Sequence, residues 1–154
     1  MSAPTDLKAD PKASATGGQL ATFWLDGDLY GVEVEHVQEV LRSQNLTRVP
    51  LAPPAVAGLI NLRGQVVTAI ELRERLGRKP RPEGTDAVVI VVRLHGEAVS
   101  LLVDSIADVV DVDATDFETP PDTLDGKARE LIRGAYKLSG QLLLALDVQK
   151  AVSA

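Results

Sequence analysis

The chain has 154 residues, of which 45% are hydrophobic and none is cysteine, and its formal net charge at pH 7 is -6. This length predicts one domain or one tightly joined pair, and the lack of cysteine excludes disulfides, thiol catalysis and cysteine-ligated metal. Because the chain is acidic and no run approaches the ~18 apolar residues of a membrane span, we expect a cytoplasmic protein with no nucleic acid partner and no direct membrane insertion.

The first 18 residues are rich in Ala, Pro, Lys, Ser, Thr and Gly, and they lack the apolar core of a signal peptide. Such a segment cannot bury enough apolar surface to offset the entropy of ordering it. We therefore predict a disordered N-terminal tail at residues 1–18 and a folded domain at residues 19–154.

The first folded element is predicted to be a β-hairpin. Two apolar runs, residues 21–25 and 29–34, meet at an Asp-Gly-Asp turn. In the next segment, residues 35–41, three apolar side chains have the i, i+3, i+4 spacing of a helix face, which predicts about one helical turn. These three residues are Val37, Val40 and Leu41.

A second hairpin is predicted after the proline-rich residues 49–54. Two apolar runs meet at the polar tip Asn61–Gly64. The turn needs Gly64, because glycine adopts positive φ without strain. It does not need Arg63, whose permanently charged side chain carries five donors, so this arginine is a candidate for binding.

Basic residues gather directly after this hairpin, at Arg73, Arg75, Arg78, Lys79 and Arg81. Residues 73–76 look like a short helical end, and cations are favoured near the C-terminus of a helix. We interpret the cluster as a solvated helix end and linker in preference to a patch for an acidic partner.

The rest of the chain repeats the first part. Residues 27–40 align without gaps to residues 96–109, at an offset of 69, and residues 58–72 align to residues 134–148, at an offset of 76. Each copy has short strands, frequent turns and a short helical end, so we predict a mainly β fold of two small β-barrels with short helices.

The duplication also separates structural positions from candidate binding positions. Glycine is kept at the second hairpin tip of both copies, as the turn demands. Arg63 instead aligns with Ser139, and Asn61 aligns with Lys137. The fold therefore does not require arginine at this place, which favours a binding role.

The sequence contains no recognisable catalytic constellation. His36 and His95 have no ligand-like partner at i+4, and we interpret both as solvated surface residues. The acidic residues 111–118 do not begin an EF-hand loop, because Asp116 and Asp122 stand where Gly and Glu are needed. We expect a binding or scaffold protein, with no cofactor and no metal, in preference to an enzyme.

Four segments of the chain resemble the CheW family of chemotaxis coupling proteins. Residues 30–40 resemble its Y-G-[IV]-x-[IV]…V-Q-E-[IV] segment, and residues 58–64 resemble its G-[ILV]-x-N-L-R-G signature. Residues 85–91 and 99–109 resemble its second half. The resemblance covers about residues 19–152 and implies two SH3-like five-stranded β-barrels that are intertwined.

This resemblance implies a non-enzymatic adaptor that bridges the cytoplasmic tip of chemoreceptors to the regulatory domain of a CheA-type histidine kinase. The receptor tip would lie in a groove between the barrels, and Glu39 and Arg63 match an acid–arginine pair of the family. In the loop at residues 117–125, Glu118 and Thr123 stand where the family can carry a basic residue and an aromatic, which leaves a second kinase contact open. The candidate partner-binding residues are Val37, Glu39, Gly58, Asn61, Arg63, Val88 and Ile106.

Two alternatives remain open at the level of the sequence. The same scaffold could serve a chemosensory pathway that does not control motility, such as one that controls pili. A small ligand-binding β-barrel protein would instead show a closed pocket with convergent polar groups, whereas the scaffold predicts an open apolar groove between the barrels.

Overall fold

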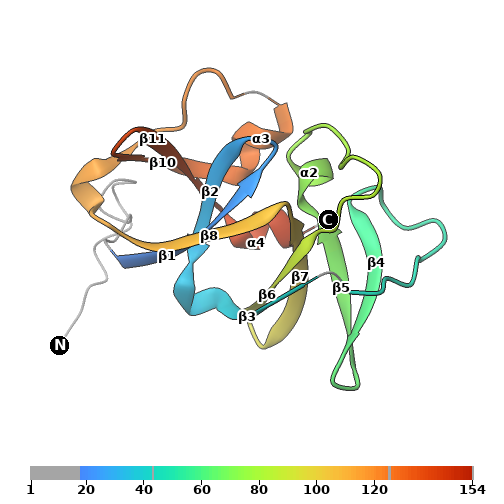
Figure 1. The fold of residues 1–154 in the computed structure, drawn as a ribbon. Coiled ribbons are helices and arrows are strands. Elements are labelled where there is room, and N and C mark those ends of the chain that lie inside the picture. The colour runs from blue at the N-terminus through green and yellow to red at the C-terminus, as the bar shows by residue number, and fades with distance from the viewer. Residues whose placement is uncertain (1–17, 43, 125, 154) are drawn as a thin grey trace.

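The computed structural model describes residues 18–42, 44–124 and 126–153 of the chain (Figure 1). These residues form a mainly β protein with two sheets and short helices, as predicted. The predicted tail lies outside the described residues except for Gly18, which begins the first strand and pairs with Val112.

The two sheets lie side by side (Figure 1). The first sheet has the strand order β8-β1-β2-β11-β10-β9. Its strands are β1 (Gly18–Leu25), β2 (Asp28–Glu33), β8 (Ser105–Val112), β9 (Phe117–Glu118), β10 (Ile132–Leu138) and β11 (Gln141–Leu146). The second sheet has the order β3-β6-β7-β5-β4. Its strands are β3 (Val37–Leu41), β4 (Val56–Leu62), β5 (Gln65–Glu71), β6 (Val88–Leu94) and β7 (Glu97–Val103).

Short helices follow the second hairpin of each copy, close to where they are predicted. Glu71 caps the first of them by accepting a hydrogen bond from the backbone N–H of Arg73, and the aligned Asp147 accepts one from Lys150. The helices are α2 (Leu72–Arg75), α3 (Gly126–Leu131) and α4 (Val148–Val152), with 3-10 turns η2 (Val34–His36) and η3 (Ala114–Asp116).

Each sheet contains strands from both copies of the duplication. In the first sheet, hairpin β1–β2 of the first copy lies between β8 and hairpin β10–β11 of the second copy. In the second sheet, hairpin β6–β7 of the second copy lies between β3 and hairpin β4–β5 of the first. The two sheets are therefore related by exchange of equivalent strands.

The strand register agrees with the duplication residue by residue. In the parallel pair of β2 and β11, Tyr30 lies opposite Leu144. In the parallel pair of β7 and β5, Val99 lies opposite Thr68. The offset of 69 relates Tyr30 to Val99 and the offset of 76 relates Thr68 to Leu144, so one contact is a copy of the other.

The second sheet has the five strands that the sequence predicts, and β9 adds a sixth to the first. Glu118 of β9 pairs with Ala135. At the equivalent place in the second sheet, Thr47 forms an isolated bridge to Leu59. The sixth strand is therefore an extended form of a contact that both copies make, and closure of each sheet into an SH3-like barrel stays a prediction.

The helical turn predicted from Val37, Val40 and Leu41 is wrong. Residues 37–41 form strand β3, antiparallel to β6, and only the preceding η2 is helical. Alternate residues of β3 are half-buried and exposed, which is the period of a strand. Backbone pairing with β6 therefore outweighs the helical spacing of three apolar side chains.

The core is shared between the sheets. Its largest cluster joins Phe23 and Tyr30 of the first sheet to Ile70, Ile90 and Leu101 of the second, and all five are at most 1% exposed. The rings of Phe23 and Tyr30 are stacked, with centroids 5.9 Å apart. Burial of this common apolar surface holds the two sheets together.

The interpretation of the basic cluster as a solvated helix end is wrong for four of its five members, since Arg75 is half-buried and donates to the carbonyls of Ala151 and Lys150. Arg73 is only 7% exposed, and it pairs with Asp104 at 2.6 Å. Arg78 pairs with Asp28 at 2.8 Å, and Arg81 pairs with Glu71 at 2.7 Å. Arg73 and Arg78 tie α2 and the loop after it to both sheets, because Asp28 begins β2 and Asp104 lies between β7 and β8.

Candidate functional site

The tip of hairpin β4–β5 is a two-residue turn that places Arg63 in a left-handed conformation. Arg63 has φ 51° and Gly64 has φ 86°, between the paired residues Leu62 and Gln65. Positive φ at both central residues is the geometry of a type I′ turn. The Asn61 side chain accepts a hydrogen bond from the Gly64 N–H at 2.9 Å, so its amide stabilises the turn.

Arg63 and Glu39 form a bidentate ion pair. Nη1 of Arg63 donates to Oε2 of Glu39 at 2.7 Å, and Nη2 donates to Oε1 at 2.8 Å. The hydrogen bonds from Arg63 lower the pKa of the Glu39 carboxyl below its ordinary value. The arginine side chain is 76% exposed and the glutamate 17%, so the guanidinium is open to a partner while its orientation is held.

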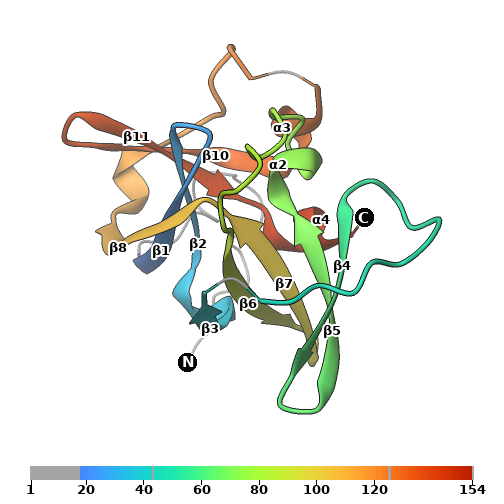
Figure 2. The same cartoon turned by 45° about the vertical axis from the view of Figure 1, so that its right-hand side comes forward.

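This pair joins opposite edges of the second sheet. Glu39 lies on β3, which is one edge strand, and Arg63 lies at the end of β4, which is the other. Figure 2 shows the β4–β5 hairpin projecting from the sheet as a ribbon. The sheet therefore curls far enough to bring its two edges within hydrogen-bonding distance.

Val37 and Ile106 occupy equivalent positions in the two copies, on the edge strands β3 and β8. Val37 lies opposite Val92, and Ile106 lies opposite Phe23. Val37 is half-buried against the common core, whereas Ile106 is 41% exposed. The structure thus places Val37 two residues from Glu39 on the same strand, and places Ile106 on the other sheet.

Gly58 is buried and allows a close backbone approach. A Cβ at this position would lie 2.6 Å from the carbonyl oxygen of Thr47. The aligned Gly134 has the same constraint, because a Cβ there would lie 2.5 Å from the carbonyl oxygen of Glu118. The structure therefore gives Gly58 a packing role beneath the hairpin, and a contribution to a binding surface stays a prediction.

Val88 begins β6 and is half-buried against the common core. It lies three residues before Val91, the partner of Glu39 in the sheet. Two exposed apolar residues that the sequence did not predict as binding residues lie on the strands that carry the ion pair and its turn. Val40 follows Glu39 and is 44% exposed, and Val66, opposite Asn61, is 61% exposed. An exposed valine can be recognised as a candidate binding residue only when the strand that carries it, and the face of that strand, are known.

The divergent loop after η3 carries its own ion pair. Glu118, where the family can carry a basic residue, lies 3.2 Å from Nζ of Lys137. Lys137 aligns with Asn61 and Ser139 with Arg63, so each hairpin tip carries one cation but at a different position. Thr123, where the family can carry an aromatic, is exposed.

Among the described residues, one group of three side chains could hold a metal ion: Glu33, Glu35 and His36. It lies around η2, which directly precedes β3. None of the helices in the described part of the chain could span a bilayer.

The described residues form a duplicated β fold with an exposed, oriented arginine at one hairpin tip. A protein-family model described as the CheW-like domain matches residues 19–154. The chain belongs to the CheW family, whose members are scaffold or adaptor proteins and not enzymes.

Relatives named chemotaxis protein CheW are similar in sequence to most of this chain. The chemotaxis protein CheW of Treponema pallidum is 30% identical over 139 residues, covering 88% of this chain and 82% of that protein. The Bacillus subtilis chemotaxis protein CheW is 32% identical over 133 residues, covering 86% and 85%. The crystal structure of the scaffolding protein TtCheW from Thermoanaerobacter tengcongensis matches with a TM-score of 0.75 and 28% identity, covering 85% and 89% of the two chains.

Proposed function

We propose that this chain couples chemoreceptors to a CheA-type histidine kinase in the cytoplasm. It would bind the cytoplasmic tip of the receptors and the regulatory domain of the kinase, without catalysing a reaction itself. Membership of the CheW family and similarity to a protein described as a scaffold support this proposal. The relatives named as chemotaxis proteins support a role in the same process.

The observation that carries the proposal is the Arg63–Glu39 pair. The fold does not need it, because the equivalent positions of the second copy hold Ser139 and Asp108. An exposed ion pair contributes little to stability, since water and salt screen it. We therefore assign the pair to partner recognition. Glu39 holds the Arg63 guanidinium in one orientation, and the exposed surface of the guanidinium contacts the partner.

The surroundings of the pair suit a protein partner. Val66 exposes apolar surface on β5, opposite Asn61 of the hairpin tip. An apolar patch beside an oriented arginine is typical of the centre of a protein interface. Val37 and Val88 would support this surface from below, because both pack against the common core.

The proposal is tested by reconstituting kinase activity from receptor, kinase and this chain. Removing the guanidinium with Arg63→Asn keeps the turn, because Asn-Gly is favoured in a type I′ turn. We expect receptor-dependent activation to fall about tenfold, as for the loss of one interfacial charge contact. The matched control is Ser139→Asn at the equivalent tip, which should activate normally. Full activation with Arg63→Asn, or no activation by the unmodified chain, contradicts the proposal.

A further inference from the structure

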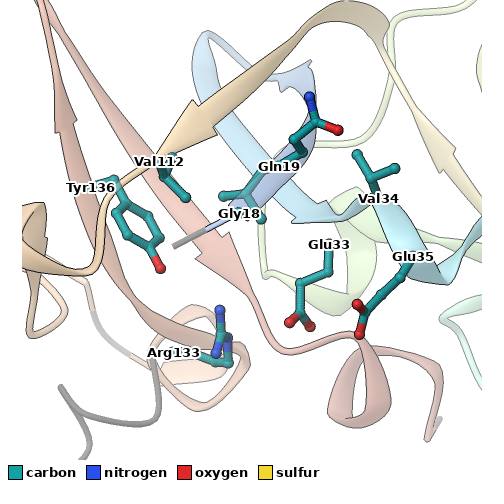
Figure 3. Close-up of a pocket in the computed structure, with 9 residues that line it drawn as sticks. Gly18, Gln19, Glu33, Val34, Glu35, Val112, Arg133 and Tyr136 are labelled. Atoms are coloured by element: carbon teal, nitrogen blue, oxygen red, sulfur yellow. The ribbon is translucent and has the colours of Figure 1, made fainter. Parts of the chain in front are cut away.

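A cavity of about 270 Å³ opens on the first sheet, between the beginning of β1, η2 and the beginning of β10 (Figure 3). Glu33 and Glu35 lie on one side of it and Arg133 on the other. The hydroxyl of Tyr136 and the side chain of Gln19 also line it. Opposite charges thus face one cavity, and no ion pair joins Arg133 to either glutamate in the described part of the chain.

The two carboxylates converge without a permanent cation. Oxygens of Glu33 and Glu35 and a ring nitrogen of His36 all lie within 4.8 Å of one another. Within residues 18–42, 44–124 and 126–153, Glu33 has an ion pair only with His36, at 3.3 Å, and Glu35 has none. Two carboxylates this close repel each other unless a cation lies between them.

The other copy of the duplication shows which side chain can pair with a carboxylate at the position of Glu35. Glu35 aligns with Asp104, which accepts hydrogen bonds from the guanidinium of Arg73 at 3.0 and 2.6 Å. Arg73 aligns in turn with Gln149, an uncharged amide that lines the neighbouring cavity. One copy therefore supplies its own guanidinium, and the other presents the equivalent carboxylate to a cavity.

Arg133 adds an unsatisfied donor on the opposite wall. Its Nε is buried and has no hydrogen-bond partner. A buried donor of a charged group without a partner is costly. The rest of the side chain lines the cavity, so an acceptor for the guanidinium is expected on that side. The aligned residue of the first copy is Ala57, so the duplicated fold does not require this arginine.

We propose that this cavity binds a basic amino acid, with its guanidinium or ammonium group against Glu33 and Glu35 and its carboxylate against the part of the Arg133 guanidinium that lines the cavity. Each charged end of such a ligand would make a contact that the chain itself does not make. The site lies on the first sheet and does not include the Arg63–Glu39 pair, so it does not depend on the proposed coupling function.

The test is a chemical-shift titration of the full-length chain with L-arginine at matched ionic strength. We expect saturable shifts confined to residues around the cavity, including Gln19 and Tyr136, with a Kd of roughly millimolar or below. Agmatine has the same guanidinium but no carboxylate, and it should bind about tenfold more weakly because it offers Arg133 no acceptor.

Two variants locate the binding. Glu35→Gln should weaken L-arginine binding about tenfold without lowering the unfolding midpoint, because Glu35 has no ion pair to lose within the described residues. Glu130→Gln, at an exposed glutamate on α3, is the control and should bind normally. The proposal is overturned if L-arginine causes no saturable shift, if Glu35→Gln binds as well as the unmodified chain, or if zinc chloride shifts the cavity residues and L-arginine does not.

Discussion

Arg73 and Asp104 form the most buried charge pair among the described ion pairs. The arginine side chain is 9% exposed and the carboxylate 23%, with Nη2 and Oδ2 2.6 Å apart. Asp104 also accepts a hydrogen bond from the backbone N–H of Asp26 at 2.8 Å. This carboxylate lies between β7 and β8, and it links α2, which follows β5 of the second sheet, to the β1–β2 turn of the first sheet.

Asp104→Asn is expected to lower the free energy of unfolding by about 3 kcal/mol. The change leaves the buried guanidinium of Arg73 without its main partner, and an unpaired buried charge is strongly destabilising. Urea unfolding followed by circular dichroism measures the effect. The control is Glu35→Gln at the equivalent position, which should be neutral, and a neutral result for Asp104→Asn as well would contradict the role of the pair.

The contribution of Asp104 should depend on pH in the acid range. Burial acts to raise the pKa of its carboxyl, but the hydrogen bonds from Arg73 and from the Asp26 backbone outweigh burial and hold the pKa at about 2, below the ordinary 3.8. Between these values the unfolded chain binds more protons than the native one. The stabilisation is therefore present above a pH of about 3.8 and is lost as the pH falls toward 2.

A pH series of urea unfolding checks this sign. The difference in free energy of unfolding between the unmodified chain and Asp104→Asn should shrink as the pH falls from about 6 to about 2. Burial raises the pKa of Glu71 in the same cluster, which acts in the opposite direction. That contribution is common to both proteins and largely cancels in the difference. A difference in the free energy of unfolding that does not change with pH would therefore argue against a lowered pKa for Asp104.

The basic cluster shows what the sequence could not predict. Its cations stand close together in the chain. From the neighbouring residues alone, one can infer only that these cations repel one another and lie near a helix end. The partner of Arg73 is 31 residues away and that of Arg78 is 50 residues away, on strands that become neighbours only after folding. Charge pairs of this kind depend on topology, and local sequence carries no signal for them.

The duplication, in contrast, could be predicted because glycine positions and apolar runs recur at constant offsets. The hairpin at Asn61–Gly64 could also be predicted, because the residues that form a tight turn are adjacent in the sequence. The exchange of strands between the sheets was not predictable from these patterns, because the parallel pair of Tyr30 and Leu144 joins residues far apart in the chain. Strand β3 was missed because five residues are too few to separate a period of 3.6 from a period of two.

Gly58→Ala should destabilise the fold by roughly 1–3 kcal/mol, the usual cost of overpacking. The added methyl meets the backbone of Thr47, which cannot move without breaking its hydrogen bonds to Leu59. Gly31→Ala is the matched comparison, since its nearest neighbours are side-chain atoms of Leu143 and Leu20 at 3.1 and 3.2 Å, which can adjust. Thermal unfolding should rank Gly58→Ala as the less stable variant, and the reverse order would exclude close backbone approach as the reason for this glycine.

Arg63→Asn should release the Glu39 carboxyl without unfolding the hairpin. Asparagine followed by glycine favours the type I′ turn, so the positive φ at residue 63 is kept without the arginine side chain. Because hydrogen bonds from Arg63 lower the pKa of Glu39, that pKa should rise toward its ordinary value in the variant. A titration of the glutamate side chains by NMR measures it, with the carboxyl of Asp113 as an internal reference, since its lowered pKa depends on hydrogen bonds from Thr115 and not on Arg63. An unchanged Glu39 titration would mean that the ion pair does not persist in solution, and the assignment of an oriented arginine to partner recognition would then lose its structural basis.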